Sequence, residues 1–222
     1  MDFNLIKEHM FKDRYDAAME LALELEKYKG NDGIVLAIPR GGVPIGYVVA
    51  KDLGFPLEII LSKKIGHPSN PEYAIGSVSL DGIVINDDVS DVSTEYIYKI
   101  ADKILQDLKT KFKYYMGDRE PTNLKNKTVI IVDDGIATGS TIIATINSAR
   151  KMNPKEIIVA APVASPLSIQ KIESISDEII ILLAPQNFMG VGQFYYDFSQ
   201  VEDEEVILLL KEANANAKLV KT

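Results

Sequence analysis

Short runs of branched apolar residues alternate along this chain with segments whose apolar residues follow helical spacing. A continuous apolar run is typical of a parallel strand buried on both faces, and a helix usually connects two such strands. The expected strands comprise residues 33–39, 57–62, 128–133, 157–161 and 178–183. The expected helices comprise residues 14–29, 43–53, 93–115, 140–152, 166–175 and 202–213. The alternation predicts an α/β fold, with a mostly parallel sheet covered by helices on both faces.

Residues 63–82 interrupt this alternation, because Gly and Pro are frequent there and indicate a loop. Residues 74–80 and 83–85 nevertheless carry apolar residues on either side of Asp81-Gly82, a pair that favours a tight turn. We therefore expect a hairpin at the end of this otherwise irregular segment.

The domain organisation is expected to be simple. No internal repeat or low-complexity linker divides the 222 residues. A chain of this length can bury one sizeable core. We expect a single domain over residues 1–222, with its core at about 14–183 and a C-terminal cap at about 184–213.

The composition excludes several classes of function. With 24 basic and 32 acidic residues, the formal net charge is −8, which argues against nucleic acid as a partner. The absence of Cys excludes thiolate metal sites, and His9 and His67 are too few for a multi-histidine zinc site. No apolar run reaches about 18 residues, so no membrane partner is expected. The first residues lack the basic start and apolar core of a signal peptide, so the expected location is the cytoplasm.

The string VIIVDDGIATGSTI, residues 129–142, joins an expected strand to an expected helix. A short Gly-containing loop at a helix start offers backbone N–H groups and a partial positive charge to an anion. Asp133 and Asp134 cannot serve as phosphate ligands, but they can face hydroxyl groups or a Mg²⁺ ion that accompanies a phosphorylated sugar. The string therefore predicts a site for a ribose with a 5-phosphate. It is not a P-loop, because it contains no Gly-Lys-Ser/Thr.

This string closely resembles the 5-phosphoribosyl-1-diphosphate (PRPP) binding motif of the type I phosphoribosyltransferases. The resemblance extends over roughly residues 14–212, and it is closest to a bacterial and archaeal branch of that superfamily. The further segments that carry it are IPRGGVPIG (38–46), SKKIGHPSNPEYAIGSV (62–78) and GVGQFYYDF (190–198). It implies the type I phosphoribosyltransferase-like fold, with a flexible loop hairpin and a C-terminal hood. It also implies a homodimer, because relatives commonly pair.

The resemblance implies a role for each part of the motif. Asp133 and Asp134 would hold the ribose hydroxyls, directly or through Mg²⁺. The 5-phosphate would be held by Ala137, Thr138, Gly139, Ser140 and Thr141. The loop after the first strand would hold pyrophosphate through Arg40, Gly41 and Gly42. Loops of that kind often contain a cis peptide that does not precede proline.

The two remaining segments would act on the leaving group and on the acceptor. Lys63 or Lys64 would neutralise the departing pyrophosphate beneath a closing lid, and Glu72 could orient a base or a proton. Phe188 in the hood could stack on a flat nucleobase. The other hood aromatic residues are expected to pack the interior of the cap; they are Phe194, Tyr195, Tyr196 and Phe198.

The implied activity is Mg²⁺-dependent transfer of the 5-phosphoribosyl group from PRPP to a nitrogenous acceptor, with release of pyrophosphate. Relatives that use 6-oxopurines typically carry Asp at the position of Ala137, so the acceptor is not expected to be a standard 6-oxopurine. Two alternatives share the same binding motif. One is a non-catalytic PRPP or nucleotide sensor, and the other is a hydrolase of phosphoribosyl compounds.

Overall fold

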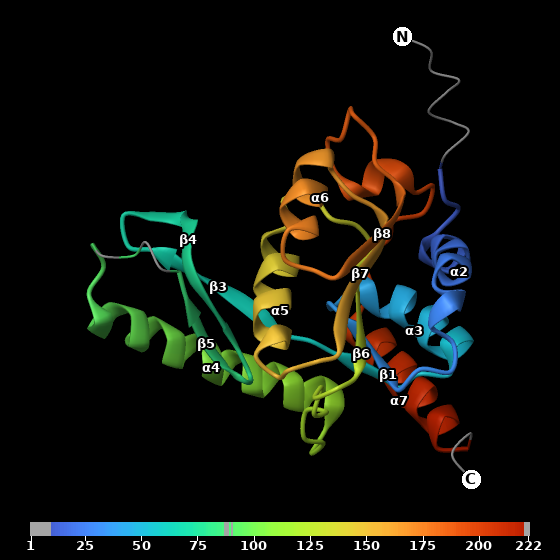
Figure 1. Ribbon diagram of the computed structural model, residues 1–222, viewed down its shortest axis with the longest axis horizontal. Helices are drawn as coiled ribbons and strands as arrows, with labels where there is room; N and C mark the ends of the chain where they lie inside the picture. Colours follow the sequence, from blue (N-terminus) through green and yellow to red (C-terminus); the bar gives the residue numbers. More distant parts are fainter. Residues whose placement is uncertain (1–9, 87–88, 90, 220–222) are drawn as a thin grey trace.

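The computed structural model describes residues 10–86, 89 and 91–219 (Figure 1). The helices are α2 (Arg14–Glu24), α3 (Gly42–Leu53), α4 (Thr94–Met116), α5 (Ser140–Arg150), α6 (Pro166–Glu173) and α7 (Asp203–Leu219). Two 3₁₀ turns accompany them, η1 (Glu26–Tyr28) and η2 (Val191–Phe194). The strands are β1 (Gly33–Ala37), β2 (Leu57–Ile59), β3 (Ser62–His67), β4 (Asn70–Ser79), β5 (Gly82–Ile85), β6 (Thr128–Val132), β7 (Glu156–Val163) and β8 (Glu178–Leu183).

The core is a five-stranded sheet with the order β2-β1-β6-β7-β8, and all of its pairings are parallel. The predicted α/β fold is therefore confirmed. The strand order reverses direction between β1 and β6, where Ala37 pairs with Val132 at the carboxyl ends of both strands. The loops that follow these two strands must start side by side. In open α/β sheets, ligands bind at such a switch point.

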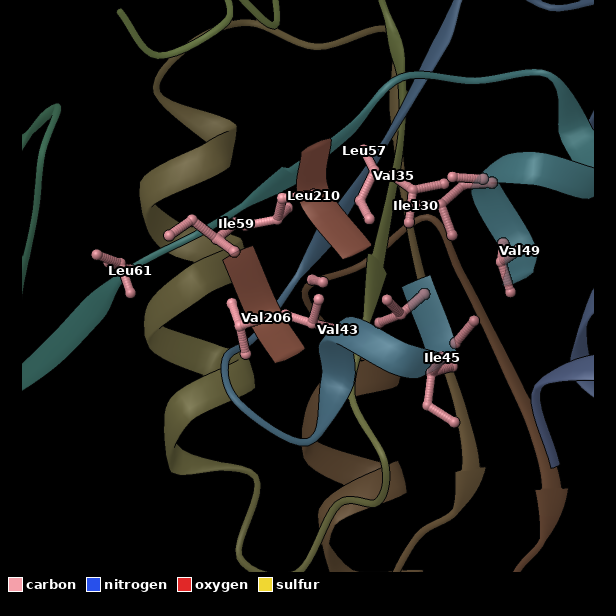
Figure 2. Packing of buried hydrophobic residues seen from close by; sticks show 14 of the residues in the cluster. Val35, Val43, Ile45, Val49, Leu57, Ile59, Leu61, Ile130, Val206 and Leu210 are labelled. Carbon is pink, nitrogen blue, oxygen red and sulfur yellow. The ribbon is translucent and has the colours of Figure 1, made fainter. Parts of the chain in front are cut away.

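Each face of the core sheet is covered by apolar side chains from helices. Alternate strand residues such as Val35 and Ile130 pack towards α2, α3 and α7, where Val206 and Leu210 lie beside α3 and β2 (Figure 2). The intervening residues, such as Ile131, pack towards α5 and α6 on the opposite face. Burial on both faces explains why the central strands β1, β6 and β7 are apolar over most of their length.

A second sheet, of three antiparallel strands in the order β3-β4-β5, extends with α4 to one side of the core (left in Figure 1). The prediction of a loop was therefore wrong for β3 and for the first four residues of β4, whereas the strand expected over residues 74–80 is present up to Ser79. Their ladder runs from the pair Ser62 and Ser79 to the pair His67 and Asn70, with register shifts beside Gly66. The hairpin predicted around Asp81-Gly82 is confirmed, because Ser79 pairs with Gly82.

The helices α4 and α6 begin at the N-cap residues expected from the sequence. Ser93 accepts a hydrogen bond from the Tyr96 amide at the start of α4, and Ser165 accepts one from the Ser168 amide before Pro166. The C-terminal helix α7 continues to Leu219, whereas the sequence predicted that this helix ends at residue 213. Within the described residues, no helix is both long enough and apolar enough to cross a membrane.

Candidate active site

Asp133 and Asp134 follow the last residue of β6, at the switch point of the core sheet. The Asp134 amide donates a hydrogen bond to Asp133 Oδ1 over 2.9 Å. Burial raises the pKa of the Asp133 carboxyl well above its ordinary value, and the charge of Asp134 adds to the increase. Burial also raises the pKa of Asp134, although the guanidinium of Arg14 acts in the opposite direction. The two acids therefore occupy different electrostatic environments.

Arg14, the first residue of α2, is the partner of Asp134. Its Nε lies 2.8 Å from Asp134 Oδ2, and the two side chains are only 10% and 13% exposed. Tyr195 approaches Asp134 from the hood, and its hydroxyl donates to the Asp134 carbonyl over 2.6 Å. The sequence did not predict either contact, because the partners lie 120 and 61 residues away from Asp134.

The loop before α5 is the predicted phosphate site. Gly139 adopts a left-handed conformation (φ 76°) at the N-cap of α5, and Thr138 and Ser140 on either side of it are exposed. Two contacts from the β7–α6 connection brace the loop: the Ile136 amide donates to the Val163 carbonyl over 2.8 Å, and Ser165 Oγ donates to the Ala137 carbonyl over 2.6 Å. A braced loop at the start of an 11-residue helix matches the geometry of an anion site.

The glycine loop after β1 contacts the acid pair directly. A Cβ atom placed on Gly41 would lie 1.9 Å from Asp134 Oδ2, and one on Gly42 would lie 2.8 Å from the Val132 carbonyl oxygen. Only glycine permits this approach. The peptide bond between Pro39 and Arg40 is cis, as the resemblance implied.

The side chain of Arg40 faces α7. Its Nη1 lies 3.6 Å from Asp203 Oδ1 and 4.0 Å from Glu202 Oε2. Tyr115 of α4 also donates a hydrogen bond to Asp203 Oδ1. The part of this loop that lies against the acid pair is therefore its glycine backbone, while the guanidinium of Arg40 lies near the carboxylates of Glu202 and Asp203 at the start of α7.

Lys63 and Lys64 lie on β3 and point to opposite faces of the small sheet. The hydroxyl oxygens of Ser62 and of Thr145 in α5 are 3.0 Å apart, so Ser62 lies on the α5 side of β3. Lys64 shares that face by alternation and is half-buried, whereas Lys63 is exposed. Glu72 lies on β4, but its side chain is outside the part of the chain that the structure describes.

The hood is formed by η2 and the residues around it. Phe188 is half-buried and stacks on Phe194, with ring centroids 5.8 Å apart, and Phe194 and Tyr195 are buried as predicted. The prediction that Tyr196 packs the interior was wrong, because its side chain is 64% exposed.

Gln193, which the sequence did not single out, closes the hood loop. Its side chain accepts a hydrogen bond from the Met189 amide and donates one to the Asn187 carbonyl.

Comparisons with known proteins agree with this geometry. Residues 9–199 match the phosphoribosyl transferase domain family. The chain belongs to this family.

Several phosphoribosyl transferase relatives match this chain. A Mycobacterium tuberculosis protein, provisionally named a phosphoribosyl transferase, is 35% identical over 209 residues, which cover 92% of this chain and 47% of that protein. The chain thus spans about half the length of the curated relatives that it matches over most of its residues. The crystal structure of TT1426 from Thermus thermophilus has a TM-score of 0.85 and 34% identity, covering 91% of this chain and 98% of that one. A uracil phosphoribosyltransferase from Mycoplasma genitalium is 39% identical over 64 residues, 29% of this chain and 31% of that enzyme.

The donor set of the candidate site suits a metal that arrives with its ligand. Among the described residues, no group of three or more His, Asp or Glu side chains could enclose an ion. Asp133 and Asp134 supply two adjacent carboxylates beside a predicted phosphate site. Mg²⁺ is usually bound through one or two carboxylates together with substrate phosphates. The acid pair therefore fits Mg²⁺ carried by a phosphorylated substrate.

The buried charge of Asp133 predicts a variant with a more stable fold. Asp133→Asn keeps an oxygen for the Asp134 amide and removes the charge, so the unfolding midpoint should rise by about 2–4 °C, the effect of ~1 kcal/mol in a domain of this size. Because the folded state raises the pKa of Asp133, the wild type loses stability as pH rises above the ordinary aspartate pKa. Thermal melts should therefore show a gain near pH 8 and little change near pH 4.

Asp177→Asn is the matched control for this prediction. Partial burial acts to raise the pKa of the Asp177 carboxyl, but hydrogen bonds from the Ile157 amide and Arg150 outweigh burial and lower it. That charge stabilises the fold above the ordinary aspartate pKa, and the contribution is lost as pH falls. Asp177→Asn should therefore lower the midpoint near pH 8. A lower midpoint for Asp133→Asn at that pH would contradict our interpretation of the acid pair.

Proposed function

We propose that this protein binds PRPP with Mg²⁺ at the switch point between β1 and β6, and transfers the 5-phosphoribosyl group to a nitrogenous acceptor. One observation carries the proposal: the glycine loop touches the acid pair, and the loop that contains the acid pair leads directly into the start of α5. One continuous surface therefore offers a phosphate site, a hydroxyl site and a second anion site. PRPP has these three groups in this order.

Each part of the surface has a separate task in the proposed reaction. Residues 137–141 hold the 5-phosphate through backbone N–H groups and hydroxyls. Asp133 and Asp134 accept hydrogen bonds from the ribose hydroxyls, and the backbone of residues 40–42 binds pyrophosphate. Bound Mg²⁺ would supply positive charge to the pyrophosphate oxygens. Holding both ends of PRPP fixes the anomeric carbon between them.

The chemical step replaces one bond at the anomeric carbon by another. The bond to the pyrophosphate oxygen breaks, and its electron pair leaves with pyrophosphate. A lone pair on the acceptor nitrogen forms the new bond, and the acceptor proton passes to a base or to solvent. Cationic side chains that face the leaving group stabilise the charge that develops on it. Lys64 is the better candidate, because β3 turns it towards α5.

The proposed class of acceptor follows from the absence of a carboxylate on the side chain of Ala137. A neutral ring nitrogen must lose its proton as the new bond forms, and a carboxylate near the ring can take it. Ala137 supplies no such group, and Asp133 and Asp134 are assigned to the sugar. An acceptor that is already anionic, or that carries a free amine, does not need this base. In the hood, Phe188 supports a flat acceptor, because its half-buried side chain can stack on a flat ring.

The binding half of the proposal is tested by calorimetry with PRPP. The wild type should bind PRPP in the micromolar range, and more tightly with Mg²⁺. Asp133→Asn combined with Asp134→Asn should weaken binding at least about tenfold, or ~1.4 kcal/mol, because the hydroxyl and metal contacts are lost. Asp177→Asn, at a surface ion pair, serves as the control. A folded wild type that does not bind PRPP with Mg²⁺ would overturn the proposed function.

The acceptor is tested by pyrophosphate release from PRPP against purines, pyrimidines, small amines and water alone. We expect rapid release with one class of anionic or amine acceptor, and slow release with hypoxanthine and guanine. Rapid turnover with either 6-oxopurine would show that Ala137 was misinterpreted. Equal release in every reaction would indicate a hydrolase, and tight PRPP binding without release would indicate a sensor.

The two lysines of β3 should differ in their effect on turnover. Lys64→Met is expected to slow pyrophosphate release on the order of 100-fold, the effect of removing one group that stabilises developing charge. Lys63→Met, its neighbour on the opposite face, should change the rate less than about twofold. Steady-state rates for both variants decide the matter. A large effect at Lys63 with none at Lys64 would reverse our assignment of the two faces.

A further inference from the structure

Arg14 is a buried cation that contacts three groups outside its own helix. Its Nε donates to Asp134 Oδ2 and its Nη1 donates to the Ser199 carbonyl, each over 2.8 Å. Its guanidinium carbon also lies 3.9 Å from the centre of the Phe198 ring, a cation–π distance. One side chain therefore joins the acid pair to the hood.

The residues just before Arg14 hold the same part of the hood through their backbone. The Phe11 amide donates to the Phe194 carbonyl, and the Phe11 carbonyl accepts from the Tyr196 amide, each over 2.9 Å. The Asp197 amide donates to the Lys12 carbonyl over the same distance. Residues 11–14 thus form a strip along the hood, and Arg14 extends from the end of that strip to Asp134.

The oxygen that Arg14 holds is the one that meets the glycine loop. Asp134 Oδ2 would lie 1.9 Å from a Cβ on Gly41, so this atom is held between the guanidinium and the backbone of the predicted pyrophosphate loop. Tyr195 holds the backbone of the same residue through its carbonyl. The orientation of Asp134 is thus set by side chains from α2 and from the hood.

A buried ion pair is a poor explanation for stability alone, because removing two charges from water offsets much of their attraction. A hydrophobic pair would fill the same space without that cost. The arrangement is better explained by a requirement for one orientation of the carboxylate. Precise placement of a few polar groups is what ligand sites require.

We propose that Arg14 is a positioning residue, which orients the Asp134 carboxylate for the sugar hydroxyls and keeps the hood in register with that carboxylate. The inference rests on the proposed function, and it adds a residue that lies outside the PRPP motif. The inference predicts that loss of Arg14 changes affinity for some ligands and not for others. Loss of Arg14 should impair ligands that contain the sugar, and it should spare inorganic pyrophosphate without Mg²⁺, which would contact the glycine loop and not the acid pair.

The test compares Arg14→Gln, Arg14→Lys and Arg150→Gln in the full chain. Arg150 is the matched control, because its Nη1 lies 2.7 Å from Asp177 Oδ2 in an ion pair outside the candidate site. Calorimetry should show affinity for PRPP with Mg²⁺ at least about tenfold lower in Arg14→Gln, with affinity for pyrophosphate, measured without Mg²⁺, changed less than about threefold. Arg14→Lys should be intermediate, since lysine keeps the charge but has only one donor group to share between Asp134 and Ser199. Arg150→Gln should bind both ligands as the wild type does.

Two results would overturn the inference. One is unchanged PRPP affinity in Arg14→Gln, and the other is an equal loss for PRPP and pyrophosphate, which a general loss of structure would produce. If Arg14→Gln does not fold, Arg14→Lys carries the same comparison.

A ligand-free measurement separates this inference from the proposed function. Hydrogen exchange at the Tyr196 and Asp197 amides should be faster in Arg14→Gln than in Arg150→Gln, because the hood loses its link to Asp134. Unchanged exchange would overturn the link between Arg14 and the hood even if PRPP binds. Faster exchange in Arg14→Gln, together with a wild type that fails to bind PRPP, would retain the link and reject the proposed function alone.

Discussion

The parallel register of β1 with β6 is the constraint on which the site depends. Ala37 and Val132 are partners at the ends of these strands, so the glycine loop and the acid loop begin next to each other. Gly41 can then lie against Asp134, and α3 and α5 start at the same edge of the sheet. A shift of register would separate these loops, and the close packing of side chains against helices on both faces of the two strands resists such a shift. The core therefore fixes the geometry of the site.

The charge of the chain shows how such a site must hold an anion. With a formal net charge of −8, the protein as a whole does not attract a polyanion from a distance. Attraction has to come from local groups: the start of α5, the backbone of the glycine loop and a metal carried by the ligand. The acids at the centre would repel phosphates, which supports their proposed place at the neutral ribose between the two anionic ends. The pairing of Asp134 with Arg14 reduces that repulsion further.

The sequence allowed the core to be predicted because its signals are local. Apolar runs and helical spacing located the five core strands and the helices between them, and the motif at residues 129–142 placed the acids and the predicted phosphate loop at the end of a strand. The strand β3 and the start of β4 were missed because Gly66, Pro68 and Pro71 suggested a loop, although pairing with neighbours and packing against α4 support the strands. The roles of Arg14 and Tyr195 beside the acid pair were missed for another reason. Their contacts with Asp134 depend on tertiary packing, which no local pattern encodes.

The parts proposed to bind PRPP and the parts proposed to select the acceptor differ in how they are built. The acids and the phosphate loop follow a buried strand, and the glycine loop follows its neighbour, so the rigid sheet sets their positions. The hood is a set of loops held by a few contacts, among them Gln193 to the backbone and Phe188 to Phe194. Loops on a fixed scaffold can change in sequence without disturbing the core. Arg14 joins the hood, the proposed acceptor region, to the acid pair that the sheet holds in place.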